Sequence, residues 1–379
     1  MKIILAPDKF KGSLTAQEVC QAMAEGILQV KPKAEIVILP MADGGEGTCR
    51  ILTENLSGRF ESLEVSDPLG RPVIAQIGLV HQKAFIEMAS ASGLHLLSPQ
   101  ERNPLIINTF GAGQLLESVI NRNMKKIVLG IGGSATNDAG TGMASALGWT
   151  FLDKNHQKLK PCGGNLLEID KIIPPKKPIQ LPKIEVACDV NAPLFGINGA
   201  AYMYAAQKGA TPQMIETLDQ GLRHLAMIVE RDFGQNLADV LGAGAAGGMG
   251  FGAMFFLNAT LKSGIEIVLE QSRFDEHLKN ADLVLTGEGK IDAQTLQGKL
   301  IAGIVKATKI HNVPVIALCG TLDLSADEVQ QLGLDYATSI LTKPLTLAQA
   351  ILETSSSIKE STALIMRLLA VKNTFSNMG

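Results

Sequence analysis

The order of apolar segments constrains the fold of this chain most strongly. Residues 2–6 are long enough for one buried strand, and a capping box at residues 15–18 opens a segment of helical spacing that Pro32 helps to end. A second strand at residues 35–39 and a helix that reaches about Leu56 follow. Strand, helix, strand and helix in this order are typical of a parallel sheet.

The same alternation returns in the last third of the sequence. We predict strands at residues 282–286, 313–318 and 338–341, and helices at residues 295–309 and 346–369. These segments repeat the pattern of the opening residues. The two ends of the chain are therefore expected to complete one sheet.

The middle of the sequence departs from this pattern. Residues 73–79 and 83–88 are predicted to be neighbouring strands, and residues 212–233 an amphipathic helix. We therefore expect an α/β protein with two α/β domains, which suits a chain of 379 residues. One is a discontinuous Rossmann-like domain with a parallel sheet, made of residues 1–66 and 285–379, and the other is an inserted mixed α/β domain, made of residues 67–284.

Charge and composition exclude several classes of partner. A formal net charge of −3 and an aromatic content of 4% are unlike those of a nucleic-acid-binding protein. The apolar run at residues 3–6 is too short for a signal peptide or a membrane span. The five cysteines are widely spaced and include no CxxC pair, so reduced thiols are expected. We expect a cytoplasmic protein, monomer or homodimer, with no nucleic-acid or membrane partner.

Four glycine-rich segments with polar residues lie at predicted strand ends or helix starts. Glycine lets a bound group approach the backbone closely, and a following helix offers unpaired amides to a phosphate. In open α/β sheets the ligand lies beyond the carboxyl ends of the strands, where such turns are found. The segments are residues 6–13, 43–48, 130–142 and 286–292.

The first two segments carry charged side chains beside their glycines. Lys9 and Lys11, which follow Asp8, can hold an acid substrate or a phosphate, although the same lysines can simply be solvated. Asp43 and Glu46 can bind Mg²⁺ through water or orient a substrate hydroxyl. The alternative is a turn in which Asp43 caps the following helix.

The third segment follows an apolar strand and precedes a helix rich in alanine and leucine. Its backbone amides, together with Ser134 and Thr136, can cradle phosphates. No Walker A loop of the form GxxxxGK[ST] occurs in the chain. Residues 130–135 match a G-x-G-x-x-A variant, which keeps a dinucleotide site open as an alternative.

The fourth segment places Glu288, Lys290 and Asp292 at the end of a strand. Lys290 can neutralise a transferring phosphoryl group, and a carboxylate can accept the hydroxyl proton. The alternative is a polar crossover loop. Two further segments remain: Asp189 ends a predicted strand, and the small residues 242–252 suit either a nucleotide pocket or close helix packing.

Several of these segments together resemble the type-1 glycerate kinases, in the same order from Met1 almost to the end of the chain. The sequence departs from them at Lys9, Gly12, Ala139 and Thr141, where many relatives have Ser, Glu, Gly and Ala. The matching residues are 6–8 with Phe10 and Lys11, 41–48, 130–138, 187–190, 207–212, 242–248, and 287–289 with Ile291 and Asp292.

The resemblance implies a glycerate kinase, an enzyme that transfers the γ-phosphoryl group of ATP to D-glycerate with Mg²⁺ in a cleft between its two domains. We expect 2-phosphoglycerate rather than 3-phosphoglycerate as the product. The main alternative is an NAD-dependent dehydrogenase of a small hydroxy acid. Against it, the first strand–helix turn lacks GxGxxG, and no histidine is placed to shuttle a proton. A non-catalytic sensor of sugar acids is a second alternative, although arginines would be expected at its strand ends.

The resemblance and the chemistry of the turns together assign residues to four roles. The expected catalytic residues are Lys11, Asp189, Lys290 and Asp292, with Asp189 or Asp292 accepting the hydroxyl proton. The expected ATP site is made of Gly132, Gly133, Ser134, Thr136, Asn137, Asp138, Gly287, Glu288 and Gly289. The expected substrate site is made of Asp8, Lys9, Lys11, Gly44 and Gly45, and the metal site of Asp43 and Glu46.

Overall fold

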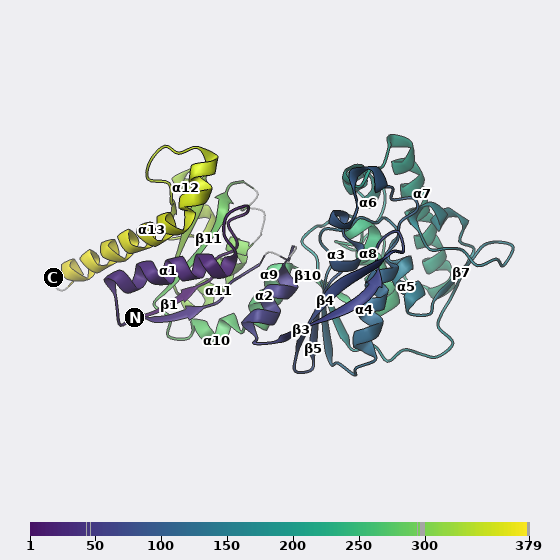
Figure 1. Cartoon of the computed structure of the whole chain (residues 1–379), viewed down its shortest axis with the longest axis horizontal. Coiled ribbons are helices and arrows are strands. Elements are labelled where there is room, and N and C mark those ends of the chain that lie inside the picture. Colours follow the sequence, from purple (N-terminus) through teal and green to yellow (C-terminus); the bar gives the residue numbers. More distant parts are fainter. Residues whose placement is uncertain (43, 46, 294, 296–299, 377–379) are drawn as a thin grey trace. The chain divides into compact units, whose positions relative to one another are not determined.

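The computed structural model describes residues 1–42, 44–45, 47–293, 295 and 300–376 of the chain. The chain forms two compact α/β units (Figure 1). Within the described part, no helix is both long enough and apolar enough to span a membrane. The first unit is made of residues 1–43 and 265–379, and the second of residues 44–264.

The first unit is built on a parallel sheet with the strand order β13-β12-β11-β1-β2. Strand β1 comes from the start of the sequence and its neighbour β11 from the last third, so both ends of the chain contribute to one sheet. The strands are β1 (Lys2–Leu5), β2 (Glu35–Ile38), β11 (Leu283–Ile291), β12 (Val315–Leu322) and β13 (Tyr336–Ser339). The helices are α1 (Ala16–Val30), α9 (Gly264–Gln271), α10 (Phe274–Leu278), α11 (Leu300–His311), α12 (Ala326–Leu332) and α13 (Leu347–Ser376).

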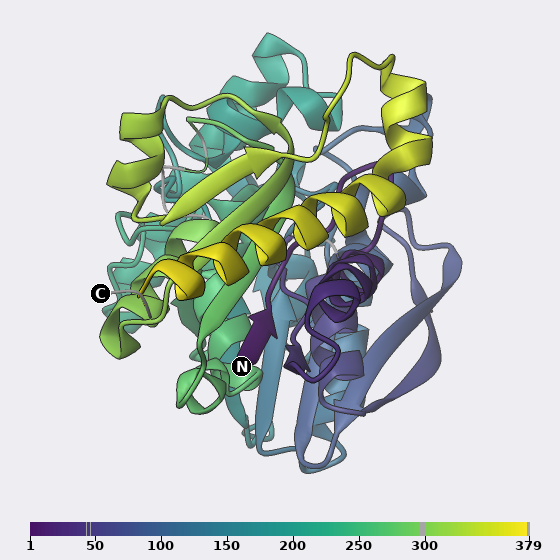
Figure 2. The ribbon, with the colours of Figure 1, turned by 90° about the vertical axis from the view of Figure 1, so that its left-hand side faces the viewer.

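Helices α1 and α13 lie side by side over one face of this sheet (Figures 1 and 2). Helix α1 begins at the predicted capping box, in which Thr15 Oγ1 accepts the amide of Glu18 and the Glu18 carboxylate accepts the amide of Thr15. Met23 of α1 and Met366 of α13 are fully buried and belong to one apolar core with Leu5 of β1. The amphipathic face that the sequence predicted for α1 therefore anchors it to the sheet.

The second unit contains a mixed sheet with the strand order β10-β9-β6-β5-β4-β3. Strands β3, β4 and β5 pair antiparallel, whereas β5, β6, β9 and β10 pair parallel. A separate antiparallel pair is formed by β7 (Thr150–Leu152) and β8 (Lys171–Ile173). The strands of the mixed sheet are β3 (Arg59–Ser66), β4 (Pro72–Val80), β5 (Lys83–Glu87), β6 (Lys126–Gly130), β9 (Lys183–Ala187) and β10 (Thr260–Lys262).

Helices pack on this sheet around one apolar core. Buried side chains of α4, α5, α7 and α8 meet those of β4, β5, β6 and β9. The predicted helix over residues 212–233 is confirmed as α7. The helices are α2 (Thr48–Asn55), α3 (Ala89–Ser92), α4 (Phe110–Ile120), α5 (Thr141–Ala146), α6 (Ala200–Tyr204), α7 (Pro212–Phe233) and α8 (Ala245–Leu257), with 3₁₀ turns at Leu94–Leu96, Pro99–Glu101, Gly163–Glu168 and Ala206–Lys208.

The boundaries between the two units differ from the expected ones at residues 66/67 and 284/285. Residues 44–66 belong to the second unit because β3, which the sequence pattern did not reveal, pairs with β4 along its whole length. Helix α2 also packs on β4 and β5. At the other end the second unit stops at Gly264, because α10 packs with α11 of the first unit.

A buried carboxylate links the parallel strands of the second sheet. Glu185 of β9 is fully buried, and its oxygens lie 2.7 Å from Lys126 Nζ, 2.9 Å from Lys183 Nζ and 3.0 Å from Lys262 Nζ. Burial alone would raise the pKa of Glu185, but the three ammonium groups outweigh it and lower the pKa to about 2. One side chain therefore ties β6, β9 and β10 together.

We predict that Glu185→Gln destabilises the protein by roughly 2 kcal/mol at neutral pH, because three ammonium groups lose their shared carboxylate. Since the folded-state pKa of Glu185 is depressed, this stabilisation is fully present above about pH 4.5 and is lost as the pH falls towards about 2. Urea unfolding at neutral and acidic pH measures the difference, with Glu168→Gln at an exposed site as the control. A difference between parent and Glu185→Gln that stays constant on acidification would contradict the prediction.

Candidate functional site

The loop after β1 carries the first set of predicted site residues. Asp8 is buried, and its Oδ1 accepts the amide of Lys9 at 2.7 Å. The amide of Asp8 donates to the carbonyl oxygen of Gly287 at 2.8 Å. Lys9 is half-buried and Lys11 is exposed. The parallel pairing of β1 and β11 therefore brings the predicted substrate residues beside the predicted ATP residues of the same unit.

The segment predicted as the fourth glycine-rich turn is a strand, which corrects the expectation from the sequence. Gly287, Glu288 and Gly289 lie inside β11 and pair with β12. A Cβ on Gly287 would lie 2.1 Å from the Leu318 carbonyl oxygen, so the strands can pair this closely only with glycine. Glycine and charged residues are uncommon inside strands, so the sequence pattern predicts a strand that ends at residue 286, whereas β11 continues to Ile291. Gly289 still lies against the backbone of Lys11.

Beyond these glycines, Lys290 is paired with two carboxylates. Its Nζ lies 3.1 Å from Asp292 Oδ2 and 3.2 Å from Asp323 Oδ2. Hydrogen bonds to Asp292 and Asp323 raise the pKa of Lys290 above its usual value. Close by, Glu288 Oε1 accepts a hydrogen bond from Thr295 Oγ1 at 3.0 Å. Sequence reasoning missed Asp323, which follows β12 and stands in no glycine-rich motif.

In the second unit, Gly44 lies against Asp189. Gly44 has a φ of +90°, and a Cβ there would lie 2.2 Å from Asp189 Oδ2, so both the backbone and the available space require glycine. Asp189 Oδ1 accepts the amide of Gly264 at 2.8 Å. The predicted metal ligands Asp43 and Glu46 lie outside the described residues. The structure thus brings a predicted substrate glycine next to one of the two predicted proton acceptors.

The start of α2 is capped by a carboxylate from a neighbouring strand. Glu87, at the end of β5, accepts the amides of Gly47 at 2.8 Å and Cys49 at 3.0 Å. Thr48 Oγ1 donates to the carbonyl oxygen of Gly45 at 2.7 Å. Glu87 therefore meets the partial positive charge of this helix start and occupies amides that a phosphate would need. Sequence reasoning missed Glu87 because capping patterns involve only residues near the helix in sequence.

The turn after β6 presents backbone amides at the protein surface. Gly132 and Gly133 are exposed, and Gly133 has a φ of +71°. Within the described chain no acceptor takes the amide of either glycine. The turn is held by its flanks: Ala135 donates to the carbonyl oxygen of Ser92 at 2.9 Å, and Leu94 donates to that of Gly133. Backbone amides without an acceptor in the described chain are suited to an anion.

A lysine without an assigned role in the sequence lies behind this turn. Lys208 ends a 3₁₀ turn and is 2% exposed. Its Nζ donates to Ser134 Oγ at 2.8 Å and to the carbonyl oxygen of Thr136 at 2.7 Å. Burial lowers the pKa of Lys208 to about 7, although the charge of Asp138 opposes this shift. The sequence signal that points to Lys208 is its position in residues 207–212, one of the segments that resemble a known family.

Asp138 links the first turns of α4 and α5 by accepting hydrogen bonds from both. Its Oδ2 accepts the amide of Thr109 at 2.9 Å, the hydroxyl of Thr109 at 2.8 Å and the amide of Gly142 at 3.0 Å. Burial raises the pKa of Asp138, although these donors oppose the shift. Asn137 is fully buried beside it, and its amide group has no hydrogen-bond partner among the described residues. These contacts give Asp138 Oδ2 a structural role, whereas its Oδ1 has no hydrogen-bond partner among the described residues, and contact with ATP stays a prediction.

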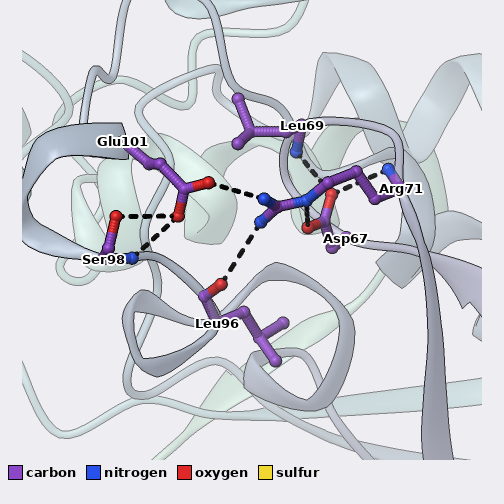
Figure 3. A network of polar contacts seen from close by, with 6 residues as sticks. All are labelled: Asp67, Leu69, Arg71, Leu96, Ser98 and Glu101. Carbon is purple, nitrogen blue, oxygen red and sulfur yellow. Dashed lines mark hydrogen bonds and ion pairs between the residues drawn. The ribbon is translucent and has the colours of Figure 1, made fainter.

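An ion-pair network supports the neighbouring segments of this turn (Figure 3). Arg71 Nε lies 2.6 Å from Asp67 Oδ2, and Arg71 Nη1 lies 2.5 Å from Glu101 Oε1. The network joins the β3–β4 turn to the 3₁₀ turn Pro99–Glu101. Apolar side chains next to both turns pack with fully buried Ala135, which precedes Thr136. The glycine turn is therefore held on a rigid base that extends to the edge of the sheet.

We predict that Thr109→Val destabilises the protein by about 2 kcal/mol, because valine keeps the shape but removes the hydroxyl that joins Asp138 Oδ2 to the amide of Met143. Urea unfolding measures the change. Thr217→Val is the matched control, since the Thr217 hydroxyl is half-buried and bonds only within its own helix. Equal unfolding midpoints for Thr109→Val and Thr217→Val would show that the buried hydroxyl contributes nothing.

The comparisons with known proteins agree with one another. The profile of the glycerate kinase family matches residues 3–370. A glycerate kinase of Halalkalibacterium halodurans is 44% identical over 365 residues, covering 95% of this chain and 96% of the relative. A glycerate 2-kinase of Escherichia coli is 42% identical over 357 residues, covering 92% of this chain and 93% of the relative.

A solved structure shares the whole fold. The crystal structure of a Salmonella typhimurium protein assigned as glycerate kinase 2 superposes with a TM-score of 0.89 at 40% sequence identity. The superposition covers 99% of this chain and 99% of that one. The two α/β units, the glycine-rich turns and these relatives lead to one conclusion: this chain belongs to the glycerate kinase family.

Proposed function

We propose that this chain transfers the γ-phosphoryl group of ATP to the 2-hydroxyl of D-glycerate. Membership of the glycerate kinase family supports glycerate as the acceptor of the phosphoryl group. The name of the Escherichia coli relative, glycerate 2-kinase, supports the 2-hydroxyl as the position that is phosphorylated. The observation that supports ATP as the phosphoryl donor is the turn after β6, where Gly132 and Gly133 are exposed and the buried Lys208 Nζ bonds the adjacent Ser134. Phosphoryl transfer depends mainly on such positioning and on charge neutralisation.

Lysines of the first unit supply positive charge for the anions in this proposal. Lys9 and Lys11 suit the carboxylate of glycerate, because they follow Asp8 in the loop after β1. Lys290 suits a phosphoryl group. Its ion pairs with Asp292 and Asp323 are exposed, and exposed pairs contribute only about 0–1 kcal/mol, so Lys290 can exchange partners at little cost.

Mg²⁺ fits the donor set of the turn that contains Gly44. Proteins usually hold Mg²⁺ through one or two carboxylates, with phosphates and water as the remaining ligands. Asp189 lies against Gly44, and the sequence places Asp43 and Glu46 beside that glycine. We therefore assign Asp43 and Glu46 as metal ligands. Bound there, the ion would neutralise charge on the ATP phosphates.

We propose Asp189 rather than Asp292 as the acceptor of the hydroxyl proton. A general base must lie within hydrogen-bond distance of the hydroxyl it activates. Asp189 Oδ2 faces Gly44 of the proposed substrate site, whereas the half-buried Asp292 pairs with Lys290. The bond from the amide of Gly264 fixes the other oxygen of Asp189 and hence the orientation of the carboxylate.

The purified protein is expected to release ADP only when D-glycerate, ATP and Mg²⁺ are all present. Phosphorus NMR of the product distinguishes 2-phosphoglycerate from 3-phosphoglycerate. L-glycerate and glycerol, which change the stereocentre or lack the carboxylate, serve as controls. Reduction of NAD by D-glycerate without any ADP release would replace the kinase by the dehydrogenase, and a 3-phosphoglycerate product would overturn only the 2-hydroxyl assignment.

Asp189→Asn is expected to lower kcat by about a hundredfold or more and to leave KM for ATP within a few-fold, because proton acceptance contributes about that factor. Asparagine keeps an oxygen for the amide of Gly264, so the local structure is retained. Asp292→Asn is the comparison and is expected to lower kcat far less. A larger loss in Asp292→Asn would reverse the assignment, and near-normal turnover in both variants would exclude both residues.

A further inference from the structure

Lys208 is a buried cation whose place in the fold is tightly fixed. The residue after it, Gly209, has a φ of +91°, and a Cβ there would lie 2.4 Å from the carbonyl oxygen of Arg102. Glycine therefore allows the chain to turn against the loop at Arg102. This turn directs the side chain of Lys208 into the protein, where it is 2% exposed.

The ammonium group of Lys208 has neutral partners only. Its Nζ donates to the hydroxyl oxygen of Ser134 and to the carbonyl oxygen of Thr136. Among the described carboxylates, none forms an ion pair with it, and the nearby Asp138 uses Oδ2 for three other donors. Burying a cation without a counter-charge is costly, so such an arrangement is expected where an anion completes it.

The anion can arrive from the solvent side of the same turn. The amides of Gly132 and Gly133 have no acceptor in the described chain and are exposed. The Ser134 hydroxyl oxygen accepts a hydrogen bond from Lys208 Nζ, which leaves its own hydrogen for another acceptor. The segment of residues 132–136 thus offers two amides without an acceptor in the described chain and one hydroxyl, and the Lys208 ammonium group contacts the same segment.

We propose that Lys208 is a positioning residue for ATP, which fixes the turn at residues 132–136 from behind and supplies the charge that holds a phosphate group on its amides. The proposal rests on the function proposed above. Lys208 acts through Ser134 and through its field, not by contact with the reacting atoms.

A coupling between ATP binding and protonation follows. In the free protein burial lowers the pKa of Lys208 to about 7, so the ammonium form is only partly populated at physiological pH. A bound phosphate favours the charged form and raises this pKa. At a pH between about 7 and the raised pKa of Lys208, ATP binding is therefore accompanied by uptake of a proton. Among the described ionisable groups, Asp138 acts on the charge of Lys208, the loop at Arg102 adjoins Gly209, and Cys162, whose thiol has a pKa raised by burial, lies near Asp138.

Steady-state kinetics from about pH 6 to pH 9 test the proposal in three variants. Lys208→Met is expected to raise KM for ATP about tenfold to a hundredfold and to leave KM for D-glycerate within a few-fold. In the parent, KM for ATP is expected to rise with pH as Lys208 loses its proton, and in Lys208→Met this rise is expected to disappear. Lys208→Arg stays charged at every pH used, so it is expected to recover ATP affinity and to show no such pH dependence. Lys154→Met, at an exposed lysine of the same unit, is the control and is expected to match the parent.

Calorimetry on the parent chain provides a test that does not depend on folding of the variants. Binding of MgATP at about pH 8, in two buffers of different ionisation enthalpy, is expected to take up about half a proton or more per ATP. Lys208→Met is expected to take up none.

The outcomes separate this inference from the proposed function. An active parent whose ATP binding takes up no proton, or a Lys208→Met variant with an unchanged KM for ATP, overturns the role of Lys208 alone. A change in KM for D-glycerate instead would mean that the turn binds the acid, which also overturns it. A parent that releases no ADP with D-glycerate overturns the proposed function itself.

Discussion

The hydrogen bonds between β1 and β11 determine where the chemistry of the first unit can lie. Ile3, Ile4 and Leu5 pair with residues 283–285, and the ladder continues past the strand because Asp8 donates to Gly287. The register therefore sets Asp8, Lys9 and Lys11 beside the glycines of β11. A slip of one residue would turn every side chain of β1 to the opposite face of the sheet and remove Asp8 from its hydrogen bond with Gly287.

In the second unit the cost of burying polar groups organises the structure. Asp138, Glu185 and Lys208 are all buried, and each is placed where backbone amides, ammonium groups or oxygen atoms compensate its loss of water. Glu185 is compensated fully by three lysines at one end of the sheet. Lys208 is compensated only by neutral oxygens, at the end where the glycine turn faces solvent. This difference in compensation is why we assign Glu185 to the stability of the fold and propose a ligand-binding role for Lys208.

The sequence predicted those features that depend on residues close together along the chain. Helical spacing identified α1 and α7, and the capping box at Thr15 was confirmed. Glycine and polar residues after a strand predicted the turn at residues 132–136, in which Gly132 and Gly133 are exposed and Ser134 and Thr136 are buried. Local patterns carry this information because capping, periodicity and turns involve only neighbours.

The features that the sequence did not predict depend on partners far apart in the chain. Strand β3 is stabilised by β4, and β11 extends through its glycines because β12 pairs with them. Glu87 at the end of β5 caps α2, from which it is 40 residues distant in the sequence at Gly47. Lys208 donates to Ser134, which lies 74 residues away in the sequence. No spacing rule connects such pairs. The family-like segments contained Lys208, but they could not show that it is buried.

The close approach of Gly44 to Gly264 has a consequence for how the chain folds. A Cβ on Gly44 would lie 2.6 Å from Gly264 Cα, so the chain passes into and out of the second unit at neighbouring points, which Asp189 holds together. Joining β1 to β11 in an unfolded chain requires closure of a very long loop, and the entropy cost of closure grows with loop length. Once residues 44–264 have folded, that loop is reduced to a short junction. During synthesis residues 44–264 are made before β11, so the second unit can fold before the first sheet is closed by the pairing of β1 with β11.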